Sequence, residues 1–285
     1  MSPLIRLEMR RALGNRLTLT CLVIGVALAL AAAVEATLDF WTFFDEGVAH
    51  IEETYADQFA KGAFTEWMPM AVMRSVPNLF FFSAPLLIGL SYAWSWRSDV
   101  RKGYAASILT RAPRAEWDRA KGLATFVVSG IVVAVPLLMN LAVVLCLVPA
   151  YPPDIVGVVY TGLWTKVFLS NLFYTCAPAY VAVRVVLDFV LAGLWGTTVL
   201  ALSRFMRNRV AIVALPYIGL IAIKYVSENL YVLSGVQLGA LTILDQLKAR
   251  GDQFYYDWGA VALGLAVMLL VSVAVPRLTR GRDVL

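Results

Sequence analysis

The sequence is poor in charge and in the side chains that enzymes most often use for catalysis. Charged residues make up 15% of the 285 residues, whereas a soluble domain usually carries about 25%. The single histidine, His50, excludes a metal site built on several histidines. The three cysteines, Cys21, Cys146 and Cys176, are spaced neither for a metal site nor for a disulfide framework. The shortage of charge therefore argues against an ordinary soluble domain.

Motifs for catalysis and for nucleotide binding are also absent. The chain contains no HExxH, no GxSxG and no GxxxxGK[ST] phosphate-binding loop. We therefore expect no intrinsic enzyme activity, no catalytic residue, no metal site and no cofactor bound by this chain. The net charge of +5 does not indicate nucleic-acid binding, because this sequence contains no basic stripe within a segment that could fold as a soluble domain.

What is abundant is apolar sequence, at 60% of the residues. A helix needs about 20 apolar residues to cross the hydrocarbon core of a membrane. Long runs of this kind predict an all-α integral membrane protein with six transmembrane helices in a single polytopic domain, residues 1–285. The predicted spans are 17–37, 75–97, 122–149, 184–204, 210–228 and 257–276.

Two shorter apolar segments, 167–183 and 229–244, complicate this count. Runs of their length are more often interfacial or re-entrant than spanning, and we interpret them so. Counting both as spans would give eight. The first apolar run also resembles a cleaved secretory signal, although it is longer than the usual apolar core of about 7–15 residues.

The distribution of charge between the spans predicts the orientation. Basic residues collect at 6–16, in the connection 98–121, in the link 204–209 and in the tail 277–282, whereas the connection 38–74 is acidic. Cytoplasmic connections carry the excess of Lys and Arg. We therefore expect a multi-pass protein of the plasma membrane, with both termini in the cytoplasm and an acidic outer loop.

Four charged residues fall inside the predicted spans or at their ends. Arg184 and Asp188 are four residues apart, as are Lys224 and Glu228, so each pair shares one helix face. Both pairs lie at the outer ends of their spans, where long side chains can reach water. We interpret them as paired or water-reaching residues; the alternative is a role in binding a substrate or a coupling ion.

The connection between spans two and three, RSDVRKGYAASILTRAPRAEWDRAKGL, has the most specific pattern. Gly103 interrupts the extension of span two, and Tyr104, Ile108 and Leu109 then share one face of a short helix that Pro113 ends. A second amphipathic helix leads into span three. Such a compact basic element suits either a groove on a partner protein or anionic lipid at the membrane surface.

Three segments resemble the permeases of type-2 ABC transporters. GYAASILTRAPRAEWDRAKGLA resembles their cytoplasmic loop, and LSRFMRNRVAIVALPY resembles their basic link between spans four and five. The opening, LIRLEMRRALGNRLTL, resembles the amphipathic helix that lies on the membrane before span one. The resemblance implies an export permease. The spans are apolar and rich in phenylalanine near 80–82, which suits a hydrophobic or amphipathic substrate such as a peptide, lipid or drug. The resemblance also implies a separate cytoplasmic ABC ATPase that uses ATP and Mg.

The resemblance further implies a coupling helix that docks the ATPase, a second permease copy or paralogue, and a re-entrant element at 229–244. Membrane lipid is the remaining expected partner, and no nucleic acid is expected. Carried over to this chain, the docking residues are Gly103, Tyr104, Ile108, Leu109, Arg111 and Arg114.

Two other functions stay open. One is a membrane sensor or assembly protein whose acidic outer loop, 38–74, recognises a ligand or peptide without any ATPase. The long loop is a departure from the permease pattern and fits this alternative. The other is a lipid-modifying enzyme, against which the lack of a catalytic constellation counts.

Overall fold

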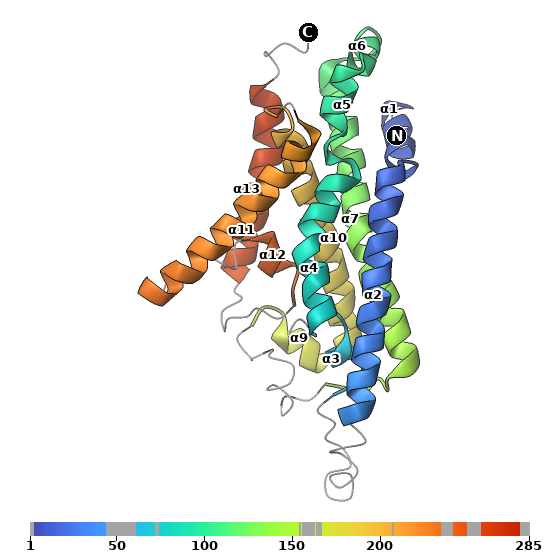
Figure 1. Cartoon of the computed structure of the whole chain (residues 1–285), viewed down its shortest axis with the longest axis vertical. Helices are drawn as coiled ribbons and strands as arrows, with labels where there is room; N and C mark the ends of the chain where they lie inside the picture. The colour runs from blue at the N-terminus through green and yellow to red at the C-terminus, as the bar shows by residue number, and fades with distance from the viewer. Residues whose placement is uncertain are drawn as a thin grey trace, which may run out of the picture.

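A bundle of long helices makes up the body of the molecule (Figure 1). In the part of the chain that the structure describes, six helices are long and apolar enough to cross a membrane, which confirms the predicted all-α membrane fold. Within the described residues all regular secondary structure is helical. The computed structural model describes residues 3–43, 61–71, 74–153, 155, 163, 167–206, 208–234, 242–249 and 258–279.

Short helices lie at both ends of the long ones. We call the end with α1, α6 and the last turn of α13 the basic end, and the end with α3 the acidic end (Figure 1). α4, the π-helix η2 and α5 together form the second membrane-length helix, Ser75–Arg101. The helices are α1 (Pro3–Leu13), α2 (Arg16–Phe43), α3 (Ala63–Glu66), α4 (Ser75–Ile88), η2 (Gly89–Ala93), α5 (Ser95–Arg101), α6 (Tyr104–Leu109), α7 (Arg114–Leu147), α9 (Ser170–Thr175), α10 (Ala177–Leu202), α11 (Arg209–Ser234), α12 (Ile243–Gln246) and α13 (Trp258–Leu278).

The long helices extend beyond several of the predicted boundaries. α10 begins at Ala177 rather than at residue 184, so most of the apolar segment 167–183 is α9 followed by the first turns of α10. Pro178 lies in the first turn of α10, where a missing backbone N–H leaves no hydrogen bond unmade. α11 likewise continues to Ser234 instead of ending at residue 228.

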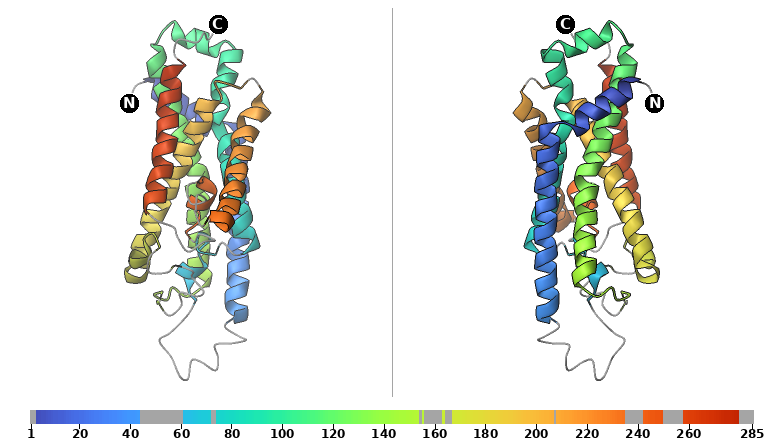
Figure 2. Two further views of the ribbon diagram at one scale, coloured as in Figure 1. Left: turned by 90° about the vertical axis from the view of Figure 1, so that its left-hand side faces the viewer. Right: turned by 90° about the vertical axis from the view of Figure 1, so that its right-hand side faces the viewer.

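α1 lies obliquely across α7 at the basic end (Figure 2). It buries Glu8 and Ala12 and leaves Leu7 and Leu13 exposed, at 47% and 42%. A helix on a soluble protein turns its apolar side inward. The exposed leucines therefore suit an apolar environment, as the predicted interfacial helix requires.

The contact between α7 and α10 depends on glycines. Phe189 packs on Gly130, Phe126 packs on Gly193, and the two rings meet edge to face with centroids 5.8 Å apart. Small residues let membrane helices approach closely, which strengthens their van der Waals contact. Gly196 continues this seam and lies directly against the Ser129 side chain.

Gly196→Ala is expected to destabilise the protein, because a Cβ at this position would overlap Ser129. Overpacking of this kind costs about 1–3 kcal/mol. Thermal unfolding of the purified protein in detergent measures the effect. Gly122→Ala in α7 is the matched control: its Cβ meets nothing within 4 Å, so a small stabilisation is expected. Equal melting temperatures for the two variants would contradict the tight seam.

Two short segments fold into the bundle at the acidic end. Trp67, which follows α3, is fully buried and donates its indole N–H to the Leu137 carbonyl at 3.1 Å. The Asn140 side chain accepts the Met68 N–H at 2.9 Å. Ala249, just after α12, donates its N–H to the Pro69 carbonyl at 3.0 Å. The predicted re-entrant segment 229–244 thus comprises the end of α11 and the buried start of α12, while 235–241 lies outside the described residues.

Candidate functional site: a buried charge cluster beneath α6

Four charged side chains from three helices meet at the basic end. Glu8 and Arg11 come from α1, Asp99 from α5 and Lys121 from α7. Lys121 Nζ lies 3.4 Å from Glu8 Oε2 and contacts Asp99 Oδ2, and Arg11 binds Glu8 at 2.9 Å and Asp99 at 3.0 Å. Two cations therefore balance two anions in what we call the charge cluster.

The charged side chains of this cluster are buried, and their burial makes the pairing structurally important. The side chains of Glu8 and Lys121 are fully buried, and that of Asp99 is 6% exposed. Buried ions must be paired and hydrogen-bonded, since desolvation otherwise shifts them to their neutral forms or destabilises the fold. The pairing satisfies this condition only while α1, α5 and α7 keep their relative positions, so the cluster fixes the three helices to one another.

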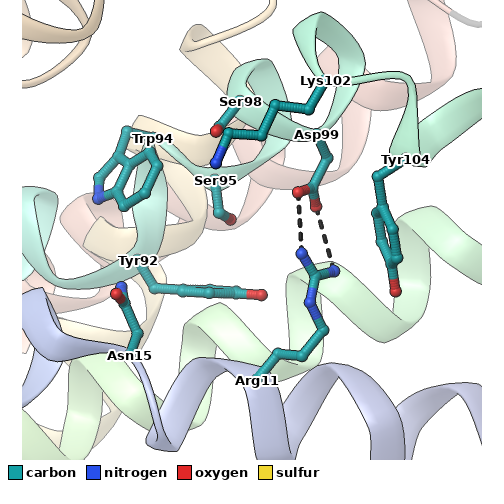
Figure 3. A pocket seen from close by; sticks show the side chains of 9 residues that line it. All are labelled: Arg11, Asn15, Tyr92, Trp94, Ser95, Ser98, Asp99, Lys102 and Tyr104. Carbon is teal, nitrogen blue, oxygen red and sulfur yellow. Dashed lines mark hydrogen bonds and ion pairs between the residues drawn. The ribbon is translucent and has the colours of Figure 1, made fainter.

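Two tyrosines complete the hydrogen bonding of Glu8. Tyr92 donates its hydroxyl to Glu8 Oε2 at 3.0 Å, and Tyr104 of α6 donates to Glu8 Oε1 at 3.3 Å. Burial and the neighbouring Glu8 carboxylate raise the pKa of Tyr104, which keeps this hydroxyl protonated as a donor. The guanidinium of Arg11 lies 3.8 Å from the centre of the Tyr104 ring (Figure 3). α6 is therefore attached to α1 through Tyr104.

Arg11 remains charged in this position. Burial alone lowers its pKa, but the hydrogen bond and the negative charge of Asp99 outweigh that effect and raise it. The planar guanidinium reaches both Asp99 oxygens, at 3.0 and 3.4 Å, as Figure 3 shows. This two-point contact fixes orientation as well as charge.

Some of the predicted docking residues face the rest of the protein, whereas others are exposed at the basic end. Gly103 has a φ of 73°, a left-handed conformation that glycine adopts without strain, and it separates α5 from α6 as expected. Tyr104 faces α1, and Ile108 and Leu109 pack partly buried against the core. Their shared face therefore points inward. The exposed residues are Ala106 and Ser107 of α6, followed by Thr110 and Arg111 directly after it.

Arg114, the last predicted docking residue, begins α7 and is partly buried. Its Nη2 donates to the Thr279 carbonyl at 3.4 Å. Arg204, between α10 and α11, binds Asp118 of α7 at 2.8 Å and the Thr279 hydroxyl at 3.3 Å. Its guanidinium also lies 4.7 Å from the Trp96 ring centre. These contacts connect α7 to α5, α13 and the link before α11.

The first predicted charged pair is present but does not reach water. Arg184 and Asp188 form an ion pair at 3.0 Å, which confirms the pairing, and their side chains are 1% and 0% exposed. The interpretation that Arg184 reaches water is wrong. α10 starts earlier than predicted, and the Arg184 guanidinium donates to the Gln246 carbonyl of α12, which covers it.

The second pair differs from its prediction. Lys224 Nζ binds Asp245 Oδ1 of α12 at 3.0 Å, and both side chains are partly exposed. The side chain of Glu228 lies outside the described residues. Spacing along one helix favoured Glu228, whereas the tertiary structure brings in a carboxylate from another segment.

Sequence reasoning missed Glu8, Asp99 and Tyr92, and it assigned Lys121 to the charges that face the cytoplasm. Lys121 is in fact fully buried and neutralised. One signal was available. Glu8 is the only acidic residue before Glu35 and stands within the arginine-rich opening. An isolated acidic residue in a basic helix indicates that its carboxylate binds a particular cation or hydrogen-bond donor elsewhere in the fold.

The acidic connection is partly used within the fold. Glu35 accepts the backbone N–H groups of Ser75 and Val76, at 3.3 and 3.1 Å, at the start of α4. Arg74 contacts both Asp39 and Glu66. Burial raises the pKa of Glu66, against the opposing effect of Arg74. These carboxylates therefore stabilise the acidic end instead of facing solvent as a group.

By their length and composition, the six apolar helices among the described residues indicate a multi-pass α-helical membrane protein. No family model, curated protein or solved structure matches the chain.

Proposed function

We propose that this chain is the permease subunit of an ATP-driven ABC exporter of the plasma membrane, with the basic end in the cytoplasm. The observation that carries the proposal is the position of α6. α5 and α7 extend past the neighbouring helices and carry α6 at the tip of the basic end (Figures 1 and 2). A short helix held out in this way suits a groove on a soluble partner.

The contacts of α6 support a coupling role. α6 connects to α1 through Tyr104 and leads within a few residues into α7. α7 in turn binds the α10–α11 link through Asp118 and Arg204. A displacement of α6 by a closing ATPase therefore moves α1, α7 and the start of α11 together. The charge cluster keeps this end rigid, so the movement is transmitted to the spans.

The complete transporter contains a cytoplasmic ABC ATPase, which uses ATP and Mg, and two permease chains, identical or paralogous, embedded in membrane lipid. The cargo is hydrophobic or amphipathic, such as a peptide, lipid or drug. The test of this class is purification of the tagged protein from its host in mild detergent. A stoichiometric soluble ATPase is expected. Its absence, even after crosslinking from a Ser107→Cys variant, would favour a sensor that acts through the acidic connection.

A pair of substitutions, one on α6 and one directly after it, tests the docking face. Ser107 and Arg111 are both exposed, so Ser107→Arg with Arg111→Glu is expected to abolish ATPase co-purification without lowering the melting temperature. Exposed substitutions usually change stability by less than about 0.5 kcal/mol. The matched control is Arg119→Glu, an equally exposed charge reversal on α7. Undiminished ATPase recovery with the α6 variant would place the docking surface elsewhere.

A further inference from the structure

A cavity of about 370 Å³ opens beside the charge cluster, between α1 and α5 (Figure 3). Part of its wall consists of Arg11 and Asp99, which are paired with each other. The rest includes Ser95, Ser98 and Lys102. These three lie on one side of the second span and its extension, because they are separated by three and then four residues.

The Ser95 hydroxyl is the decisive feature of this cavity. Ser95 is 4% exposed, and its Oγ is buried without a hydrogen-bond partner among the described residues. Figure 3 shows its side chain turned into the cavity. A buried hydroxyl without a partner destabilises a fold, so native structures nearly always satisfy it. A ligand oxygen in the cavity would accept its hydrogen.

Lys102 brings positive charge to the same cavity. The Lys102 side chain extends over the cavity toward Ser95 and Ser98 (Figure 3). Arg209, at the start of α11, donates to Ser98 Oγ at 3.3 Å and lies 5.1 Å from the Trp94 ring centre. Neither Lys102 nor Arg209 forms an ion pair within the described part of the chain. Within the described lining, Lys102 is therefore a cation without a carboxylate of its own near the unpartnered Ser95 hydroxyl, and Arg209 binds the neighbouring Ser98.

The chemistry that satisfies these groups is a phosphate. Asp99, the carboxylate in the described lining, is bound by Arg11 and Lys121, so it does not pair with Lys102. A phosphate group presents several acceptor oxygens to an ammonium and to hydroxyl donors at once. A carboxylate, with two oxygens, would leave donors unmet.

The surroundings indicate where the phosphate comes from. Asn15 lines the cavity, and two residues later the exposed apolar surface of α2 begins, with Leu17 43% and Leu19 50% exposed. A phosphate in the cavity would place attached acyl chains along that surface. We propose that this cavity binds the phosphate group of a membrane phospholipid. The site is separate from the exposed face of α6, and it does not depend on the proposed transport function.

The test compares lipid binding by purified, delipidated full-length protein. Native mass spectrometry and the melting temperature are measured with dioleoylphosphatidylglycerol, and dioleoylglycerol serves as the lipid that lacks phosphate. One phosphatidylglycerol is expected to be retained and to raise the melting temperature. Ser95→Ala with Lys102→Gln is expected to weaken binding about tenfold or more, as loss of a charge-assisted hydrogen bond does.

Two controls distinguish a loss of lipid binding at the cavity from a general effect of removing a positive charge and from a loss of folding stability. Arg101→Gln removes an equal charge from an exposed neighbour that does not line the cavity, so it should bind lipid normally. Ser95→Ala alone should not lower stability without lipid, because its hydroxyl has no partner to lose. Equal lipid retention by the double variant and by Arg101→Gln overturns the proposal. So does equal stabilisation by dioleoylglycerol. Equal stabilisation by glycerol 3-phosphate or by inorganic phosphate overturns the lipid assignment in favour of a soluble phosphate ester or of free phosphate, respectively.

Discussion

Lys121→Met is expected to lower the free energy of unfolding by about 3–5 kcal/mol, the usual cost of removing one partner from a buried ion pair. The substitution leaves Glu8 and Asp99, both buried, with Arg11 as the one cation that binds them among the described residues. The charge cluster then carries a net negative charge in a site with little water. Thermal unfolding in detergent measures the loss, and Arg119→Met, on the exposed side of α7, is the matched control.

A second substitution tests whether charge balance is the cause. Glu8→Gln in the Lys121→Met background removes the surplus negative charge and keeps one acceptor oxygen, while its amide N–H faces the other of the two tyrosine hydroxyls. Most of the lost stability should return, since residues in one ion-pair network are strongly coupled. If Lys121→Met melts at the same temperature as Arg119→Met, the cluster does not stabilise the basic end.

Arg184→Met is expected to have an effect of similar size, about 3–5 kcal/mol, for the same physical reason. Asp188 is fully buried and would lose its cation, while the Gln246 carbonyl of α12 would lose a donor. Both changes weaken the attachment of α12 to the bundle. The measurement is again the melting temperature in detergent.

The contrast with the other charged pair makes this prediction specific. Lys224 and Asp245 are 25% and 15% exposed, so Lys224→Met should cost only about 0–1 kcal/mol. The double change Arg184→Met with Asp188→Leu should recover much of the stability lost in Arg184→Met, since it leaves no buried charge. Similar losses for Arg184→Met and Lys224→Met would show that burial does not decide the effect.

The helices could be predicted because their causes are local. About 20 apolar residues suffice to specify a membrane helix, and the structure has six such helices among the described residues. Gly103 and Pro113 likewise limit α6 by their own backbone chemistry. Where boundaries differ, as at Ala177, an internal arginine was interpreted as the end of a span although a tertiary contact satisfies it.

The charge cluster could not be predicted from local pattern. Glu8 and Lys121 are 113 residues apart, and periodicity shows which side of a helix a residue occupies but not what it meets. Tyr104 illustrates the limit. The sequence correctly placed it on one face of a short helix with Ile108, but the packing of α1 turned that face inward.

The sequence by itself determined the membrane environment and the class of fold, because the length and apolarity of each helix suffice to define a membrane span. Only the tertiary structure decided which charges are buried. The local sequence around a charged residue is the same whether its side chain faces water or binds a carboxylate from a distant helix. That choice depends on how α1, α5 and α7 pack, since in a dry interior a charge is stable only beside its partner.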